Sequence, residues 1–112
     1  MIIVKPWGQE EILEVNDFYV VKRLTMNEGH RCSLQYHEVK RETIYVLEGT
    51  LRITSGSSTS ELSNHDFIAG QSITLEPNVI HRMQAITTSV YLEASTPELD
   101  DVVRLSDDYS RD

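Results

Sequence analysis

A series of short β-type segments separated by turn-forming residues limits what this chain can fold into more than any other feature of its sequence. Seven segments of four to seven residues are rich in β-branched and aromatic side chains. They cover Phe18–Leu24, Ser33–His37, Thr43–Leu47, Leu51–Thr54, Ser72–Leu75, His81–Thr87 and Ser89–Ala94. Turn formers such as Asn27-Glu28-Gly29, Glu48-Gly49-Thr50 and Pro77-Asn78 separate them. Many short strands with regular turn signals predict an all-β sandwich or barrel rather than alternating strands and helices.

Helical periodicity is nearly absent. We expect at most one short helix, near Glu98–Leu105, because no other stretch carries an apolar pattern of helical period over three turns. The serine-rich segment Ser55–Ser60 predicts a mobile hairpin tip on the surface.

The chain length of 112 residues suits one domain with its own core and is too short for two. We therefore expect a single domain over residues 1–112, with residues 1–16 packing on the barrel and residues 97–112 forming an acidic C-terminal segment. No apolar run approaches the roughly 20 residues that span a bilayer, and the N-terminus has no secretory features. The single cysteine, Cys32, fits a reducing compartment, so the expected location is the cytoplasm.

The formal net charge of −8 argues against two classes of partner. Nucleic acids and anionic membranes both attract proteins through a positive field, which this composition does not provide. A net-acidic protein still binds a phosphorylated metabolite where a few basic side chains converge. We therefore expect a small-molecule ligand, with no nucleic acid and no membrane.

Side chains able to ligate a metal occur at spacings that bring them together. Residues i and i+2 of a strand share a face, so Gln35 and His37 project to the same side, together with Arg31 and Ser33. If the strand that starts near Glu42 pairs antiparallel with the first, Glu42 returns close to His37, with Ile44 and Val46 below it. A later strand contributes His81, with Met83 and Ala85 on the same face; Cys32 should face away and serve packing.

Gln35, His37, Glu42 and His81 are therefore the predicted ligands of one divalent metal ion. Each of these residues alone has an ordinary structural explanation, such as a solvated glutamate or a hydrogen-bonded histidine. Two imidazoles, a carboxylate and an amide oxygen suit zinc, the first candidate, and also manganese, cobalt, nickel or iron(II). The sequence does not choose among these ions.

The same residues resemble the two motifs of the cupin superfamily, whose members are jelly-roll barrels (double-stranded β-helices). The first motif runs from Gly29 through Gln35, His37 and Glu42 to Gly49, and the second ends at His81. The second motif departs from the family, because the stretch from Pro77 to His81 is one residue short and lacks its glycine.

A closer resemblance, from Lys5 to Arg111, is to the cupin domains of type II phosphomannose isomerases. It is carried by Lys5-Pro6-Trp7-Gly8, Val21-Lys22-Arg23, Ser33-Leu34-Gln35, His81-Arg82, Asp100-Asp101-Val102-Val103-Arg104 and Asp107-Asp108-Tyr109. That family also has glutamine in place of the first-motif histidine. There are departures: Lys40 stands where the family has arginine, and Thr43-Ile44 replace an aromatic pair.

The resemblance implies a metal-dependent isomerase that interconverts mannose 6-phosphate and fructose 6-phosphate through a metal-stabilised enediolate. Lys40 and Glu38 are the nearest candidates for the proton-transfer base, although Lys40 would need a lowered pKa and equally suits charge stabilisation. Phosphate would be held by Arg31, assisted by Lys22 and Arg104. Each of these basic residues is alternatively a solvated surface charge. A homodimer is expected, with Trp7 in a packing or dimer contact.

Two other functions remain open at this point. One is a non-catalytic metal-binding cupin that binds a carbohydrate or regulates an enzyme of nucleotide-sugar synthesis. The other is an iron(II) dioxygenase, which Gln35 and the isomerase-like flanking residues disfavour.

Overall fold

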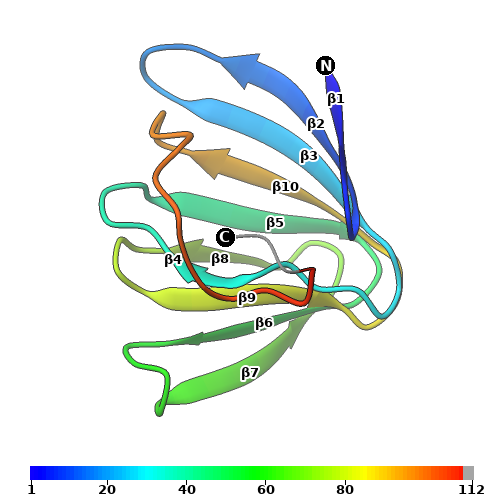
Figure 1. Cartoon of the computed structure of the whole chain (residues 1–112). Coiled ribbons are helices and arrows are strands. Elements are labelled where there is room, and N and C mark those ends of the chain that lie inside the picture. The colour runs from blue at the N-terminus through cyan, green and yellow to red at the C-terminus, as the bar shows by residue number, and fades with distance from the viewer. Residues whose placement is uncertain (110–112) are drawn as a thin grey trace.

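The strands form two antiparallel sheets that face each other in a computed structural model describing residues 1–109 (Figure 1). The six-stranded sheet has the order β1 (Ile2–Lys5), β2 (Gly8–Val15), β3 (Val20–Met26), β10 (Ser89–Ser95), β5 (Glu42–Glu48), β8 (Ser72–Leu75). The five-stranded sheet has the order β11 (Val103–Ser106), β4 (Leu34–Tyr36), β9 (Ile80–Ala85), β6 (Leu51–Gly56), β7 (Leu62–Phe67). This architecture confirms the all-β prediction.

All seven predicted strands are present, with ends that differ by up to two residues. Four further strands were missed: β1 and β2, which form a hairpin on β3, together with β7 and β11. The one short helix left open near Glu98–Leu105 does not form, because Val103–Ser106 pairs with β4 as strand β11. A local pattern did not reveal this pairing, which depends on a strand more than 60 residues away along the chain.

Regular alternation along the strands builds the core between the two sheets. On β3 the inward positions include Leu24 and Met26, and on β5 they are Ile44 and Val46, all at most 4% exposed. The facing sheet contributes apolar side chains that include Leu51, Ile53, Met83 and Ala85. Period-two alternation places one face of each strand inside, so Ile44, Val46, Met83 and Ala85 lie on the buried face as predicted.

Two segments outside the regular strands were singled out from the sequence. Ser57–Glu61 connects β6 and β7 and is the tip of the hairpin predicted around Ser55–Ser60. After β10 the chain crosses from the six-stranded to the five-stranded sheet, orange to red in Figure 1, where β11 pairs with β4. Residues 110–112 of the predicted acidic C-terminal segment lie outside the described residues. Residues 1–109 contain no helix of the length and apolar character that crossing a membrane requires.

The β5–β6 turn depends on Gly49, which has a φ of +80°. A Cβ at this position would collide with the carbonyl oxygen of Thr88 and approach the hydroxyl of Ser89 to 2.9 Å. Gly70 has a similar φ of +90°, but its Cβ position has no atom within 4 Å. Alanine substitutions at the two glycines therefore distinguish two costs. Both positions impose a positive φ on the new residue, but only Gly49 adds a steric collision.

We expect Gly70→Ala to lower the free energy of unfolding by about 1–2 kcal/mol, the cost of a left-handed alanine. Gly49→Ala should cost at least about 1 kcal/mol more, because the Thr88 carbonyl must move as well. Urea unfolding of both variants, followed by circular dichroism, measures the difference. Equal losses would contradict the close approach at Gly49.

Candidate metal centre and its cavity

Three buried side chains from different elements converge between the sheets. His37 directly follows β4, Glu42 begins β5 and His81 lies in β9. These side chains are almost inaccessible to solvent, with exposed fractions of 4%, 2% and 0%. One potential ligand atom from each lies within 4.8 Å of the others. The structure thus brings together three of the four predicted ligands as one cluster.

The cluster forms in a different way from the one expected. An antiparallel pairing of the strand of Gln35 with the strand of Glu42, considered from the sequence, does not occur. Strand β4 pairs with β9 and β11, whereas β5 belongs to the opposite sheet and pairs with β10 and β8. Glu42 therefore reaches the histidines across the space between the sheets rather than along a hairpin.

The connection from β4 to β5 is held by Asp101 of the C-terminal segment. Its carboxylate accepts hydrogen bonds from the backbone N–H groups of Glu38, Val39 and Lys40, at 3.0, 2.7 and 2.8 Å. The N–H groups of Lys40 and of the two residues before it lower the pKa of the Asp101 carboxyl, because they stabilise its charged form. The backbone carbonyl of Asp101 also contacts Nδ1 of His37.

Backbone carbonyls fix the orientation of both imidazoles. Nδ1 of His37 meets the carbonyl of Asp101, and Nδ1 of His81 lies 3.0 Å from the carbonyl of Val79. A carbonyl only accepts hydrogen bonds, so Nδ1 carries the proton in each ring. Nε2 of each neutral ring then presents a lone pair to the centre, which is the arrangement found for histidines that bind metals.

These nitrogens face an oxygen that also carries lone pairs. Oε1 of Glu42 lies 3.0 Å from Nε2 of His81 and 3.6 Å from Nε2 of His37. All three atoms are buried, and none makes a hydrogen bond of acceptable geometry. Three electron pairs directed at one dry point repel one another unless a cation or a proton lies between them. The donor set therefore fits a divalent metal ion.

The electrostatics of the cluster agree with a site that attracts positive charge. Burial alone would raise the pKa of Glu42, but His37, His81 and Lys40 together hold that pKa well below its usual range. Burial would likewise lower the pKa of His37, yet Glu42 beside it raises the pKa overall. The carboxylate is thus ionised and attracts either a proton on histidine or a metal ion.

Gln35 lies beside the cluster as a possible fourth ligand. It pairs with His81 across the β4–β9 ladder, and its Oε1 accepts the hydroxyl hydrogen of Ser33 at 2.6 Å. This hydrogen bond fixes the amide oxygen in the interior. Coordination by Gln35 stays a prediction.

Lys40 connects the cluster to a second buried carboxylate. Its Nζ lies 3.4 Å from Oε2 of Glu42 and 3.3 Å from Oε2 of Glu93 on β10. Burial lowers the pKa of Lys40, but Glu93 and Glu42 outweigh burial and raise it. The lysine therefore remains a cation, whereas a role as general base would require a lowered pKa. This favours the charge-stabilising alternative for Lys40.

A cavity of about 130 Å³ opens beside the cluster. Gln35, His37 and Lys40 line one part of it, and the C-terminal segment contributes Leu99, Val102 and Arg104. The apolar lining also includes Trp7, Leu24, Met83 and Tyr91. Of the three cluster residues, His37 borders this cavity, so the cavity adjoins the candidate metal centre.

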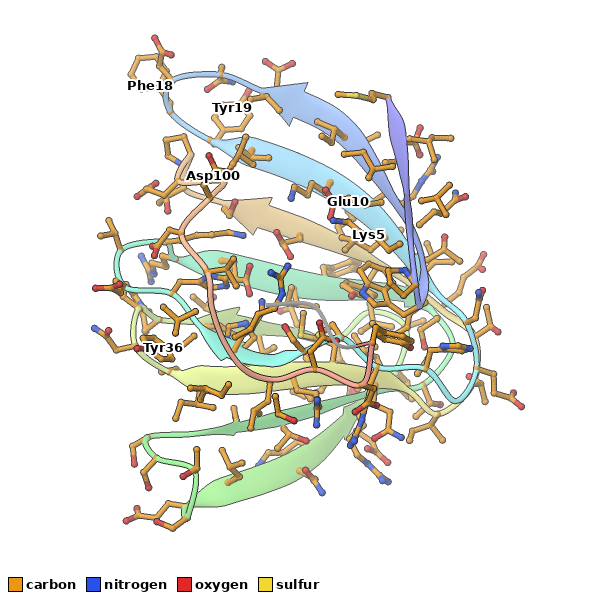
Figure 2. The ribbon with its side chains drawn as sticks, viewed as in Figure 1. Lys5, Glu10, Phe18, Tyr19, Tyr36 and Asp100 are labelled. Atoms are coloured by element: carbon orange, nitrogen blue, oxygen red, sulfur yellow. The ribbon has the colours of Figure 1, made fainter. Side chains whose placement is uncertain are left out.

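The N-terminal hairpin adds further charges to the cavity wall. Nζ of Lys22 lies 3.1 Å from Oε1 of Glu10, and Nζ of Lys5 lies 4.0 Å from Oε2 of the same carboxylate. Figure 2 shows Lys5 and Glu10 next to each other on this hairpin. In total, four basic and two acidic side chains line the cavity: Lys5, Lys22, Lys40, Arg104, Glu10 and Glu93.

Two predicted site residues lie elsewhere. Arg31 forms a two-pronged ion pair with Asp108, at 2.6 and 3.0 Å, and does not line the cavity. The side chain of Glu38 is exposed to solvent and is also absent from the lining. Lys22 and Arg104, the other two phosphate-binding candidates, do border the cavity.

Cys32 and Trp7 both belong to the hydrophobic core. Burial raises the pKa of the Cys32 thiol to about 11, which agrees with a packing role. Cys32 nevertheless borders the cavity together with Ser33, so it does not face away from the site as expected. The alternation fails here because β4 begins only at Leu34.

The sequence interpretation missed Glu93, Glu10 and Tyr91. A signal for two of them was present, because alternation from the aromatic Tyr91 places Glu93 on the same inward face of β10. A charged residue at an inward position marks a functional or strained site. No comparable signal identified Glu10, since its hairpin was not predicted.

A buried His/Glu/His cluster between two antiparallel sheets defines a cupin with a candidate metal centre. The fold matches the RmlC-like cupin of Shewanella frigidimarina NCIMB 400 with a TM-score of 0.78, at 18% identity over 89% of this chain and 86% of that one. It also matches Bacillus subtilis oxalate decarboxylase, described with Mn(II) centres, with a TM-score of 0.79 and 20% identity over 93% of this chain and 29% of that one. These likenesses establish the fold.

This chain belongs to the family described as Mannose-6-phosphate isomerase C-terminal, whose model matches residues 1–107. A curated relative, mannose-1-phosphate guanylyltransferase of Escherichia coli strain K12, is 32% identical over 114 residues. The match covers 97% of this chain and 23% of the relative. The chain thus spans less than a quarter of the length of the curated relatives it matches. The cupin and isomerase-family resemblances predicted from the sequence are confirmed.

Asp101→Asn should lower thermal stability at neutral pH. The pKa of Asp101 is lowered in the folded state, so its stabilisation is present above the unfolded value near pH 4 and is lost as pH falls through the folded pKa. The difference in Tm between wild type and variant should therefore shrink below about pH 4. Asp100→Asn is the matched control, because the side-chain carboxylate of Asp100 (Figure 2), next to Asp101 in the chain, makes none of these hydrogen bonds to backbone N–H groups. A difference independent of pH would contradict this role.

Divalent metal should stabilise the protein, and chelator should remove the effect. At an ion concentration about 100 times Kd, binding adds about 2.7 kcal/mol, which raises Tm by several degrees. We expect Glu42→Gln to weaken binding by at least about 100-fold, because it removes the only carboxylate of the cluster.

Glu48→Gln, at the exposed end of the same strand, is the control and should bind metal like wild type. Isothermal titration calorimetry with Zn²⁺ and Mn²⁺ gives the affinities, and circular dichroism checks that each variant is folded. Equal affinity of the Glu42 variant and wild type would exclude this centre.

Proposed function

We propose that this protein is a metal-dependent isomerase that interconverts an aldose phosphate and a ketose phosphate. Mannose 6-phosphate and fructose 6-phosphate are the first candidate substrates. The observation that carries the proposal is the buried convergence of His37, Glu42 and His81 beside a basic cavity. Membership in the mannose-6-phosphate isomerase C-terminal family supports the choice of reaction.

The charge of the cavity supports a phosphorylated substrate. The chain as a whole has a net charge of −8, yet the cavity lining has two more basic than acidic side chains. A local positive excess in an acidic protein concentrates anions at that point. We assign phosphate binding to Lys22 and Arg104, joined by Lys5, and leave out Arg31 because it pairs with Asp108 outside the cavity lining.

The residues around the centre suit proton-transfer chemistry at a sugar carbonyl. His37, Glu42 and His81, with Gln35 as a further oxygen donor, would hold a divalent ion, and that ion would supply Lewis-acid polarisation of the carbonyl. Lys40 remains protonated and stabilises negative charge that develops on the substrate oxygens. The apolar part of the lining, including Trp7 and Tyr91, excludes water from the reacting carbons.

Some details of this proposal rest on the sequence alone. Zinc remains the first candidate metal, and manganese, cobalt, nickel and iron(II) suit the same donor atoms. The cytoplasmic location and the homodimer stay predictions.

We expect the metal-loaded protein to convert mannose 6-phosphate to fructose 6-phosphate, and unphosphorylated mannose at least about 100-fold less efficiently, because the basic lining recognises phosphate. Proton NMR in D₂O measures both the product and the exchange of sugar protons. A chelator should abolish turnover, and Glu42→Gln should do the same, whereas Glu48→Gln should retain full activity.

Other outcomes distinguish the alternatives. Tight binding of the sugar phosphate without turnover or exchange would favour a non-catalytic carbohydrate-binding cupin. Turnover that survives complete removal of metal would contradict the proposed chemistry.

A further inference from the structure

Strand β10 presents a row of inward-facing polar side chains next to the candidate metal centre. Ser89, Tyr91, Glu93 and Ser95 alternate along its buried face and are at most 6% exposed. Tyr91 and Glu93 both line the cavity. A buried carboxylate in a cavity wall costs free energy unless it is paired or used. Glu93 is therefore the residue whose presence most needs an explanation.

Two lysines from neighbouring elements flank Glu93. Its Oε2 lies 3.3 Å from Nζ of Lys40, whose Nζ lies 3.4 Å from Oε2 of Glu42. Lys22 is directly opposite Glu93 in the β3–β10 ladder. A single ammonium group therefore separates Glu93 from the carboxylate of the metal centre. Glu93 and His37 of that centre line the same cavity.

The other candidate bases of the site are less suitable. Lys40 is held in its protonated form by the carboxylates on both sides. Glu42 belongs to the metal cluster, and Lys40 pairs with its other oxygen. Glu38 is exposed outside the cavity, and Glu10 is paired with Lys22 at 3.1 Å.

The environment of Glu93 favours uptake and release of a proton. Burial raises the pKa of its carboxyl, and the nearby charge of Glu42 raises it further, whereas Lys40 and Lys22 act in the opposite direction; the net change is upward. A carboxylate whose pKa moves toward neutrality is a better proton carrier at physiological pH than an ordinary surface glutamate.

We propose that Glu93 moves the proton between C1 and C2 of the substrate, a role that rests on the isomerase function proposed above. Its carboxylate takes the C2 proton of the open-chain aldose. The C2–H electron pair forms the C1=C2 bond, and the carbonyl electron pair moves onto O1. After the O2 proton passes to O1, the O2 electron pair forms C2=O, and the C1=C2 pair takes the proton back from Glu93 at C1.

The hydroxyl of Tyr91 supports a polar ligand at this position. It is fully buried and has no hydrogen-bond partner among the described residues, although Tyr91 lines the cavity two residues before Glu93. Burial raises its pKa well above the usual value, so the group is a neutral donor. A substrate oxygen beside Glu93 would satisfy this hydroxyl.

The test compares Glu93→Gln with wild type in metal-loaded protein. We expect kcat for mannose 6-phosphate to fall by about 100- to 10,000-fold, the usual contribution of a general base, with loss of deuterium incorporation in D₂O. Metal content should be unchanged. Affinity for mannitol 6-phosphate, which has no carbonyl and does not isomerise, should stay within about threefold of wild type, because the amide preserves the size of the side chain.

Two control variants and a conservative variant sharpen the comparison. Glu10→Gln, the other acidic side chain of the lining, should raise KM through its partner Lys22. Glu48→Gln, exposed on β5, should behave like wild type. Glu93→Asp keeps the negative charge but places it on a side chain that is one methylene group shorter. It should lower kcat by at least about tenfold without altering metal content, and it decides the question if the glutamine variant does not fold.

Several results would overturn the assignment. A Glu93→Gln protein with kcat within about threefold of wild type would exclude Glu93 as the base. Loss of metal or of mannitol 6-phosphate binding in parallel with kcat would indicate a structural role instead. If wild-type protein neither isomerises the substrate nor exchanges its protons, the isomerase proposal fails and this one with it.

Discussion

The buried negative charge of Glu42 is the constraint around which the interior is arranged. An ionised carboxylate with 2% exposure costs several kcal/mol in a low-dielectric interior unless nearby charges and dipoles compensate it. Lys40 compensates one oxygen, and a proton or a cation between the carboxylate and the two imidazoles of His37 and His81 compensates the other. Both sheets contribute, so the centre exists only when they face each other in the correct register. Removing one partner of such a buried group typically costs about 3–5 kcal/mol.

The same strands carry both the apolar side chains that pack the core and the charged side chains of the site. On three adjacent strands, the inward positions change from apolar to charged within two residues: Leu24 to Lys22 on β3, Tyr91 to Glu93 on β10 and Ile44 to Glu42 on β5. Apolar packing at one end fixes the separation of the sheets. The same separation positions the charged side chains at the other end of these strands, so the site is built on rigid strands rather than on loops.

The C-terminal segment completes the site in a way that couples several parts of the fold. Asp101 contacts His37 through its carbonyl and holds the β4–β5 connection through its carboxylate. Arg104 lines the cavity, whereas Asp108, four residues later, forms an ion pair with Arg31 outside the cavity. The excess of basic over acidic side chains in the cavity lining therefore depends on the basic residue that this segment contributes and on the one that it pairs elsewhere. All of these contacts lie within residues 1–109 of the chain.

The sequence by itself determined the fold class, most of the strands and the residues of the metal cluster, because alternation and spacing are local properties. It also contained the signal for Glu93, through its alternation with Tyr91. Only the tertiary structure decided that β4 and β5 lie in opposite sheets and that Arg31 pairs with Asp108. Such contacts join segments far apart in the chain, and their choice depends on the packing and burial of the whole molecule, which no local pattern encodes.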